Sequence, residues 1–446
     1  MSEKEKQIKL GLFLAPQGHH LAAWRYPSTA SSELMSFDYY HKLAQTAERG
    51  KFDMLFFADN YAFAESFPEA AAQTVPIRPE PITLLSALAA VTKHIGLAAT
   101  ASTTYNEPFH IARKFGSLDH LSQGRAAWNV VTSADQAEAM NFHSDAHLLH
   151  ALRYERAEEF LNVVKGLWNS WEDDAFVVDK DEARFADSSK LHTLHHKGKW
   201  FSVRGPLHLP RPVQGFPVII QAGGSEPGKE LAARTADVIF AAWQTLEEAQ
   251  LFYSDIKGRV VKHGRSPDDL KIMPGVFPII GRTEAEADEK QKELEELIPQ
   301  EAGVRLLSTL ISFDLSPYPV DGPLPKLPEL EQVNGVKSRF TLLKDLAERE
   351  GLTIRQLYKR IAGARGHREI KGTPVQIADQ LEDWFRQGAA DGFNIMPPYM
   401  PGGLEEFVDL VVPELQRRGL FRTEYTGRTL REHLELSRPP HPAAQR

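Results

Sequence analysis

Short apolar runs alternate with segments of helical spacing eight times along the chain, and this alternation constrains the fold more than any other feature. The runs are rich in β-branched and aromatic residues, and turn residues bound them, as is typical of buried strands. The predicted strands cover residues 8–15, 53–59, 95–102, 126–133, 217–223, 238–243, 271–281 and 392–397.

Eight strands with helices between them predict an α/β fold, namely a (β/α)8 TIM barrel. A doubly wound open sheet is the alternative, but no G-x-G-x-x-G follows the first strand to support it. Insertions are expected after strands 4 and 7. The first, residues 170–215, is polar and aromatic and predicts a loop excursion with a short hairpin.

The second insertion, residues 298–371, combines a proline-rich loop with helical pieces. Its apolar content is thin for an independent core, so we expect one domain over residues 1–446 with 298–371 inserted into it. The tail beyond residue 429 is rich in proline and charge, which predicts a segment on the surface or against a partner.

Composition excludes several classes of function. The formal net charge is −8, and no basic stripe is interleaved with aromatics, so we expect no nucleic-acid partner. The absence of cysteine excludes thiolate metal sites and cysteine nucleophiles. The apolar run near the N-terminus is too short for a signal peptide, and no later stretch approaches the roughly 20 apolar residues of a membrane span. A cytoplasmic protein without membrane contact is the expectation.

Polar and aromatic side chains gather where the predicted strands end. The active site of a barrel lies at the carboxyl ends of its strands, so these groups are expected to converge on one ligand. Polar loops occur everywhere, which is the competing interpretation. The groups are Gln17, His19 and His20 after the first strand, Asp59 after the second, Thr100 to Tyr105 at the third, Asn129, Thr132 and Ser133 at the fourth, Gln221 to Ser225 at the fifth, Trp243 at the sixth and Asn394 at the eighth.

The turn QAGGSEPGKE, residues 221–230, is the clearest candidate for anion binding. Gly224 lets the backbone approach a ligand, and Ser225 stands where amides open a helix with the positive end of its dipole. The turn lacks the G-K-[ST] of a P-loop, so nucleotide triphosphate hydrolysis is not expected. His150 and Tyr154 are four residues apart and share a helix face that can reach a phosphate or a ring. The alternatives are a simple helix cap for the turn and a surface position for the histidine.

Three histidines, His192, His195 and His196, lie close together in the first insertion. No carboxylate stands among them at a spacing that would complete a ligand set. We therefore expect a solvated loop and no metal site.

Several long motifs give the chain a family resemblance. GKFDMLFFAD, STTYNEPFHIARKFGSLDHLSQGR, WNVVTS, QAGGSEPGKELAARTADV and the segment from DGFNIMPPYMPGG to FRTEY resemble the bacterial-luciferase-like flavin monooxygenases. The match is to the group of nitrilotriacetate monooxygenase component A, with relatives that act on EDTA, dibenzothiophene sulfone and long-chain alkanes. It runs from about residue 9 to about residue 432.

The resemblance implies a barrel that binds reduced FMN (FMNH2) supplied by a separate NAD(P)H:flavin reductase. Such an enzyme inserts one atom of dioxygen into its substrate through a flavin hydroperoxide, and homodimers or homotetramers are expected. The implied FMN contacts are Asp59, Thr100, His150, Tyr154 and Ser225, and Asn129, Thr132 and Ser133 are placed against the ring or the ribityl chain. His19 or His20 is implied as the proton donor or substrate contact, since the pKa of histidine lies near working pH.

The motif details TAERGKFD, SWEDDAF and TIRQLYKR are most similar to the aminopolycarboxylate enzymes, so nitrilotriacetate or EDTA is the expected kind of substrate. Arg25, Arg78 and Arg153 lie in loops from which they could pair with carboxylates, although each is also compatible with a plain surface charge. Gln17 mildly favours a polar substrate. The same chemistry on a sulfone, thioether or alkane is one alternative, and a flavin-binding barrel without oxygenase activity is another.

Overall fold

Eight parallel strands close into a barrel in the computed structural model, which describes residues 6–62, 72–133, 136–142, 148–330 and 337–445. Each strand pairs with the next in chain order, and the last pairs with the first, so the predicted (β/α)8 barrel is confirmed. The strands are β1 (Lys9–Phe13), β2 (Met54–Phe57), β3 (Gly96–Ser102), β4 (Ala126–Val131), β7 (Val218–Ala222), β8 (Val238–Ala241), β9 (Lys271–Ile280) and β11 (Gly392–Ile395).

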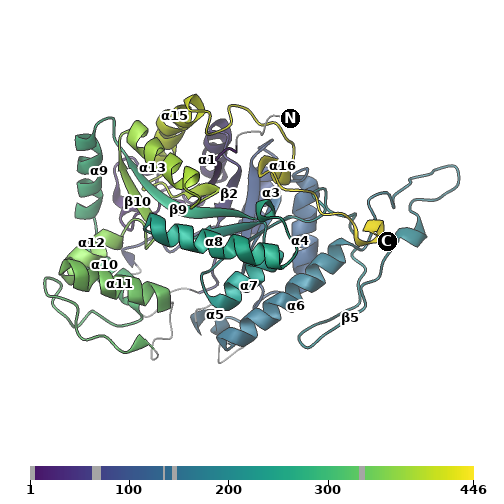
Figure 1. Cartoon of the computed structure of the whole chain (residues 1–446), viewed down its shortest axis with the longest axis horizontal. Helices are drawn as coiled ribbons and strands as arrows, with labels where there is room; N and C mark the ends of the chain where they lie inside the picture. The colour runs from purple at the N-terminus through teal and green to yellow at the C-terminus, as the bar shows by residue number, and fades with distance from the viewer. Residues whose placement is uncertain (1–5, 63–71, 134–135, 143–147, 331–336, 446) are drawn as a thin grey trace.

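Helices cover the outside of the barrel (Figure 1). Their starts carry expected signals: Thr245 and Thr373 cap α8 and α13 with a reciprocal glutamate or glutamine three residues later. Among the described residues, no helix combines the length and the apolar character needed to cross a membrane. The main covering helices are α1 (Phe37–Arg49), α3 (Pro81–Ala89), α4 (Pro108–Leu121), α6 (His150–Trp168), α7 (Glu226–Thr235), α8 (Leu246–Lys262), α9 (Glu284–Glu296), α13 (Pro374–Arg386), α14 (Gly402–Glu406) and α15 (Val412–Arg417), the last two joined by a π-helical turn at Phe407–Val411.

The pleat of the strands divides their side chains between two cores. Met54, Ala98 and Ala127 belong to a cluster that fills the barrel, whereas Leu55, Leu97 and Trp128 pack outward against the helices. Successive residues point to opposite faces of a strand, so Thr100 and Asn129, two positions after Ala98 and Ala127, share the inward face of their strands.

Buried aspartates fasten the amino ends of the strands. The carboxylates of Asp53, Asp237 and Asp391 each accept a hydrogen bond from the first residues of a neighbouring strand, at 2.7, 2.8 and 2.8 Å from the amides of Leu10, Ile219 and Ile272. Asp119 accepts from the amide of Ala126 and the side chain of Gln214. Paired acidic groups at this end fit a role in stability, since function in barrels lies at the other end.

The C-terminal tail closes the amino end of the barrel, so the prediction of a surface segment beyond residue 429 is wrong for residues 430–436, whereas most of the described residues after 436 lie at the surface. Leu430 of α16 (Leu430–His433) and Leu434, which follows this helix, are fully buried in the interior cluster. Arg431 forms a two-pronged ion pair with Asp237 at 3.1 and 2.8 Å. The prediction failed because the polar residues of the tail are themselves buried and paired.

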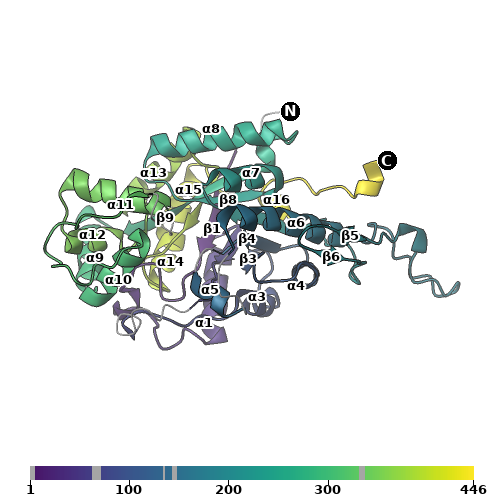
Figure 2. The ribbon, with the colours of Figure 1, turned by 90° about the horizontal axis from the view of Figure 1, so that it is seen from below.

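The insertion after β4 follows α6 and projects from one end of the molecule (Figures 1 and 2). It contains the expected hairpin, formed by the antiparallel strands β5 (His196–Lys197) and β6 (Ser202–Val203). The described C-terminal segment passes beside this insertion, where Arg438 pairs with Asp173 at 2.5 Å.

The insertion after β9 projects at the opposite end of both views. Its helices α10 (Gln300–Ile311), α11 (Lys337–Glu350) and α12 (Ile354–Ile361) share a hydrophobic cluster, which also takes in Leu21 and Ala22 from the loop after β1. Residues 368–372, expected to be part of the irregular insertion, instead form β10 (Arg368–Gly372), which pairs in parallel with the outer half of β9. The division of the chain into one domain with residues 298–371 inserted stays a prediction.

Candidate active site

The loop after β1 buries both predicted histidines. His19 and His20 are 2% and 4% exposed, and burial together with the charge of Arg365 lowers the pKa of each to about 3. Both imidazoles are therefore neutral at neutral pH, and neither can act as a charged proton donor there. Nε2 of His19 lies 2.7 Å from the carbonyl oxygen of Phe13, to which it must donate.

The two histidines differ in whether a ring N–H donor remains available to a ligand. Nδ1 of His20 accepts a hydrogen bond from the amide of Ala22 at 3.2 Å, so its neutral ring carries the proton on Nε2. His19 thus holds the end of β1, whereas His20 keeps an N–H donor for a ligand.

A chain of hydrogen bonds crosses β2, β3 and β4 on the inner face of the barrel. Nδ2 of Asn129 donates to Oγ1 of Thr100 at 2.8 Å, and that hydroxyl donates to the carbonyl of Phe57 at 2.6 Å. Oδ1 of Asn129 is buried and has no hydrogen-bond partner among the described residues. Buried polar atoms are seldom left unpaired, so this oxygen is a candidate acceptor for a donor of a bound ligand.

The end of β4 is tied to α6. Ser133 adopts the left-handed region at φ 54°, and its hydroxyl donates to Oγ of Ser102 at 2.9 Å. Arg153 donates to the Ser133 carbonyl, while the neighbouring Thr132 carbonyl accepts from Oγ1 of Thr104 at 2.7 Å. The predicted Thr132 and Ser133 therefore shape the strand end through backbone contacts.

The glycine turn and α6 are in contact. Oγ of Ser225 lies 3.3 Å from the hydroxyl of Tyr154 and also caps α7 by accepting from the amide of Gly228. The rings of His150 and Tyr154 are 4.9 Å apart, so this helix face turns toward the same turn.

The backbone of this turn is accessible to a ligand. Gly223 has φ +137°. Among the described residues that are not its chain neighbours, a Cβ added there would come within 4 Å of the Tyr154 hydroxyl alone, at 3.7 Å, and a Cβ on Gly224 would come as close to Trp243 alone, at 3.9 Å. Open backbone beside a helix start and two hydroxyls is a suitable setting for a phosphate.

Asp59 follows β2 in a half-buried position. Burial raises the pKa of its carboxyl to about 6, and the positive charge of Arg78 partly opposes this shift. A carboxyl that is held close to neutral can donate or accept a hydrogen bond near neutral pH, which suits contact with a polar heterocycle.

The three arginines predicted to pair with substrate carboxylates, Arg25, Arg78 and Arg153, differ in their contacts. Arg25 is exposed and donates to the carbonyl of Leu297 in the second insertion. Arg153 donates a hydrogen bond to the carbonyl oxygen of Ser133. Arg78 is exposed, and its charge is felt by both Asp59 and Arg365. Only Arg78 therefore fits the predicted role of an available cation.

Two residues of the mouth lie in the stretch before β10 and were not predicted. The ring of His367 stacks on Phe240 of β8, with centroids 5.0 Å apart and planes at 9°. The loop that carries Arg365 and His367 is joined to the β1 loop by the hydrogen bond from the Leu21 amide to the Ala362 carbonyl. The signal that could have located them is the tight run AGARGH, whose small residues fit close packing.

Two further side chains at the strand ends have polar atoms without partners. Asn394 of β11 is fully buried, and neither amide atom has a hydrogen-bond partner among the described residues. Nε1 of Trp243, after β8, is also buried and unpaired within that part of the chain. Both positions were predicted as polar or aromatic strand ends.

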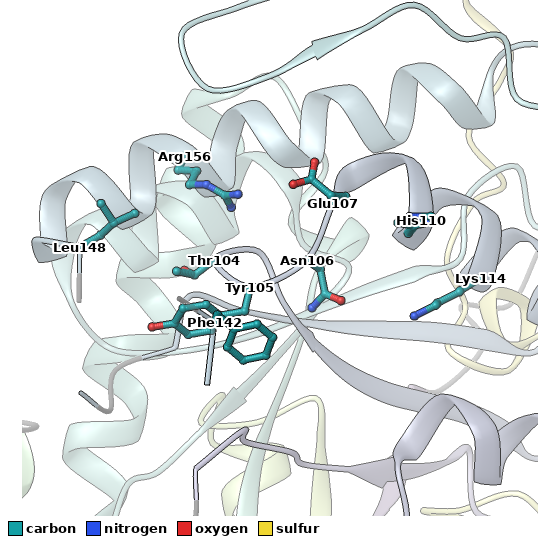
Figure 3. A pocket seen from close by; sticks show the side chains of 9 residues that line it. All are labelled: Thr104, Tyr105, Asn106, Glu107, His110, Lys114, Phe142, Leu148 and Arg156. Atoms are coloured by element: carbon teal, nitrogen blue, oxygen red, sulfur yellow. The ribbon is translucent and has the colours of Figure 1, made fainter. Parts of the chain in front are cut away.

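A separate pocket of about 440 Å³ lies between α4 and α6 (Figure 3). Its floor is the stacked pair of Tyr105 and Phe142, with ring centroids 4.6 Å apart, and Arg156 and Lys114 reach it from the two helices. None of the predicted flavin contacts lines it. The pocket is thus a neighbour of the candidate site and not part of it.

The histidines of the first insertion do have a carboxylate nearby. Nε2 of His192 lies 2.8 Å from Glu172, and ligand atoms of these two residues and His441 fall within 4.8 Å of one another. Both ring nitrogens of His441 are engaged with the backbone, at Asn169 and Ala443. Glu172 lies far from these histidines in sequence, so their spacing did not indicate it, and the expectation of a solvated loop without a metal site stays a prediction.

Comparison with known proteins assigns the class. The family model described as luciferase-like monooxygenase matches residues 17–391. The chain therefore belongs to the luciferase-like monooxygenase family, which confirms the prediction from its motifs, and it is an enzyme of that class.

Particular relatives are similar over almost the full chain. N-acetyl-S-(2-succino)cysteine monooxygenase of Bacillus subtilis (strain 168) is 57% identical over 441 residues, which are 98% of this chain and 99% of that protein. Nitrilotriacetate monooxygenase component A of Aminobacter aminovorans is 53% identical over 449 residues, 99% of both chains. A crystal structure of riboflavin lyase with modified FMN and riboflavin is similar at a TM-score of 0.86 and 29% identity, covering 99% of each chain. Family membership and this FMN-containing neighbour support a flavin cofactor.

Proposed function

We propose that this enzyme is a two-component monooxygenase that uses reduced FMN and dioxygen to oxidise a small polycarboxylate. The observation that carries the proposal is the set of buried, unpaired polar atoms at the strand ends: Oδ1 of Asn129, both amide atoms of Asn394 and Nε1 of Trp243. Leaving such groups unpaired is costly, and a flavin, with donors and acceptors along one edge of its ring, is able to pair them. The residues therefore fit the cofactor that the family indicates.

The phosphate of FMN is assigned to the glycine turn. Gly224 offers open backbone, Ser225 and Tyr154 offer hydroxyls, and His150 lies against Tyr154. The ring and ribityl chain are assigned to Asp59, Thr100, Asn129, Thr132 and Ser133, which line the ends of β2, β3 and β4. We propose no metal at this site.

Reduced FMN supplies the electrons that activate dioxygen, and the protein supplies position, dryness and hydrogen bonds. His20 is proposed to contact the substrate through its Nε2 proton as a neutral donor, because its pKa of about 3 excludes the charged form. His19 keeps the end of β1 in place through Phe13 and has an indirect role.

Two observations favour a polycarboxylate substrate. The two relatives reported above are named for nitrilotriacetate and for N-acetyl-S-(2-succino)cysteine, and both names describe small molecules with several carboxyl groups. The mouth also carries the positive charge of Arg365, which has no ion-pair partner among the described residues, and that of Arg78 beside Asp59. A nitrogen carries the carboxylate arms of the first molecule and a thioether sulfur links those of the second, and the greater identity to the second relative makes the thioether a full candidate beside the aminopolycarboxylate.

We further propose a separate NAD(P)H:flavin reductase as partner, because a relative at 53% identity is itself called component A. A homodimer or homotetramer in the cytoplasm, without nucleic acid or membrane contact, completes the proposal.

The test is a substrate panel with an added flavin reductase and limiting NADH, with oxygen uptake, peroxide and product measured together. The panel holds nitrilotriacetate, EDTA, N-acetyl-S-(2-succino)cysteine, dibenzothiophene sulfone and a long-chain alkane. We expect product in step with oxygen uptake for one of the polycarboxylates and little peroxide. Product from the sulfone or the alkane alone would refute the substrate class. Peroxide with every compound would favour a flavin-binding barrel without oxygenase activity.

A further inference from the structure

The loop of residues 362–367, between α12 and β10, carries Arg365, whose guanidinium has no hydrogen-bond or ion-pair partner among the described residues. The loop is fixed on both sides of the barrel mouth. The Leu21 amide donates to the Ala362 carbonyl at 2.9 Å, and a Cβ on Gly363 would lie 2.6 Å from the ring of Phe277 on β9. At its far end, His367 stacks on Phe240 of β8. Arg365 is thereby held over the mouth with little freedom, in the left-handed region at φ 50°.

The Arg365 side chain makes no hydrogen bond or ion pair with any described residue, and its Nε atom is completely buried. Arg125 and Arg431 differ in this respect: Arg125 donates to carbonyl oxygens around the end of α3, and Arg431 pairs with Asp237. Arg153 and Arg156 each leave one buried nitrogen unpaired, but Arg153 donates to the Ser133 carbonyl and Arg156 lies over the ring of Phe201. A guanidinium cannot shed its proton to escape burial, as a lysine can. Arg365 is half-buried, and leaving its solvent-shielded Nε unpaired is costly to the ligand-free enzyme, so an anionic ligand that paired with the guanidinium would remove this cost.

The charges around Arg365 all favour an anion. Its neighbours His19 and His20 are neutral at neutral pH, and the other charge that acts on it is the positive one of Arg78. Among the described residues no carboxylate pairs with Arg365, whereas Arg78 also acts on the carboxyl of Asp59. His20 adds the Nε2 proton noted above. A planar fork of donors matches the two oxygens of a carboxylate, which it can bind in a bidentate manner.

We propose that Arg365 binds a carboxylate of the substrate and so selects polycarboxylates over neutral substrates. This inference rests on the proposed function, since it places the substrate at the mouth beside the flavin. The flavin phosphate has its own assigned site at Ser225 and Tyr154, so Arg365 is not needed for the cofactor. An Arg365 that belongs to the cofactor, or to the fold alone, is an outcome that the test distinguishes.

The experiment compares wild type with Arg365→Gln, Arg365→Lys and the control Arg360→Gln, which changes an exposed arginine on α12 of the same insertion. Thermal unfolding is recorded in a buffer free of polyvalent anions, and calorimetry gives the Kd of nitrilotriacetate, acetate and FMN. We expect R365Q to unfold at or above the wild-type Tm and to bind nitrilotriacetate about 10- to 100-fold more weakly, the range for a lost hydrogen bond to a charged group. FMN affinity should stay within twofold, and R360Q should match wild type throughout.

Three results would overturn the proposal. One is R365Q with wild-type affinity for nitrilotriacetate. Another is a large fall in the Tm of R365Q that R365K restores, which would give the charge a structural partner. The third is a loss of FMN affinity in R365Q. If R365Q does not fold, the test uses R365K, since lysine keeps the charge but cannot form the bidentate contact. A Kd of R365K for nitrilotriacetate within twofold of the wild-type value would then contradict the proposal.

Failure of the proposed function has a different signature. It appears in the wild-type enzyme as an absence of coupled product from every polycarboxylate, whereas binding of nitrilotriacetate and its dependence on Arg365 are measured without turnover.

Discussion

Leu430 closes the amino end of the barrel, and its truncation to alanine should weaken the fold without affecting the chemistry. Its side chain is fully buried, and its methyl groups lie where a Cβ on Gly96 would be, at 2.6 and 2.8 Å. The surroundings are strand backbone, including the Asp53 carbonyl, and cannot relax into the space. We therefore expect a loss in the upper part of the measured range for Leu→Ala, about 4 kcal/mol.

This loss translates into a modest shift of Tm. Unfolding entropy of about 2.1 cal/mol/K per residue amounts to about 0.9 kcal/mol/K for 446 residues, so Leu430→Ala should lower Tm by about 4 °C. Differential scanning calorimetry measures the shift, and Leu251→Ala, at a leucine 74% exposed on α8, is the control with no expected change. Turnover at 25 °C should stay within twofold of wild type, because the substitution lies at the end opposite the mouth. An unchanged Tm, or a loss of turnover at constant Tm, would refute the tail as a structural plug.

Three further predictions follow from the same structure. Folding raises the pKa of the Asp59 carboxyl from 3.8 to about 6, so the free energy of unfolding falls as pH rises from about 4 to about 6 and the carboxyl ionises. Asp59→Asn should therefore match wild type in Tm near pH 4 and exceed it above pH 7. Equal Tm values for the two proteins at both pH values would contradict the burial argument. Arg431→Met leaves the carboxylate of Asp237 buried without its partner and should destabilise by about 3–5 kcal/mol, with much of the loss recovered by adding Asp237→Asn; additive losses in a denaturation series would count against the pair. Tyr154→Phe removes one hydroxyl of the assigned phosphate site and should raise the Kd of reduced FMN about 10-fold at constant Tm, whereas an unchanged anaerobic titration would move the phosphate elsewhere.

The barrel could be predicted from the sequence because each of its eight strands is indicated by a short apolar run, a pattern local in the sequence. A run such as residues 126–131 is buried on both sides and has no alternative to a parallel strand. Contacts such as Tyr154 with Ser225 could be expected too, since both lie at the carboxyl end of the same barrel once the strands are placed.

The remaining features depend on contacts between distant segments. β10 is polar and short, and only its pairing with the extended outer half of β9 makes it a strand. The C-terminal segment carries charged residues that ordinarily indicate solvent, yet Arg422 before the tail and Arg431 within it are paired with Asp53 and Asp237 at the amino end of the barrel. No local pattern specifies such partners.

Arg365 shows the same limit at the site. The small residues of AGARGH indicate close packing around it, but they do not indicate that its guanidinium lacks a partner, which depends on what surrounds it in space. The predicted roles of His19 and His20 also needed the structure, because burial and the nearby guanidinium decide which form of the ring is present.

The central claim is that separate strand ends converge on one flavin, and a crystal structure of the FMN complex tests it most directly. We predict the phosphate against Gly224, Ser225 and the Tyr154 hydroxyl, with a ring atom paired to Oδ1 of Asn129. A nucleotide bound elsewhere, such as in the pocket between α4 and α6, with Oδ1 of Asn129 still unpaired, would contradict the account.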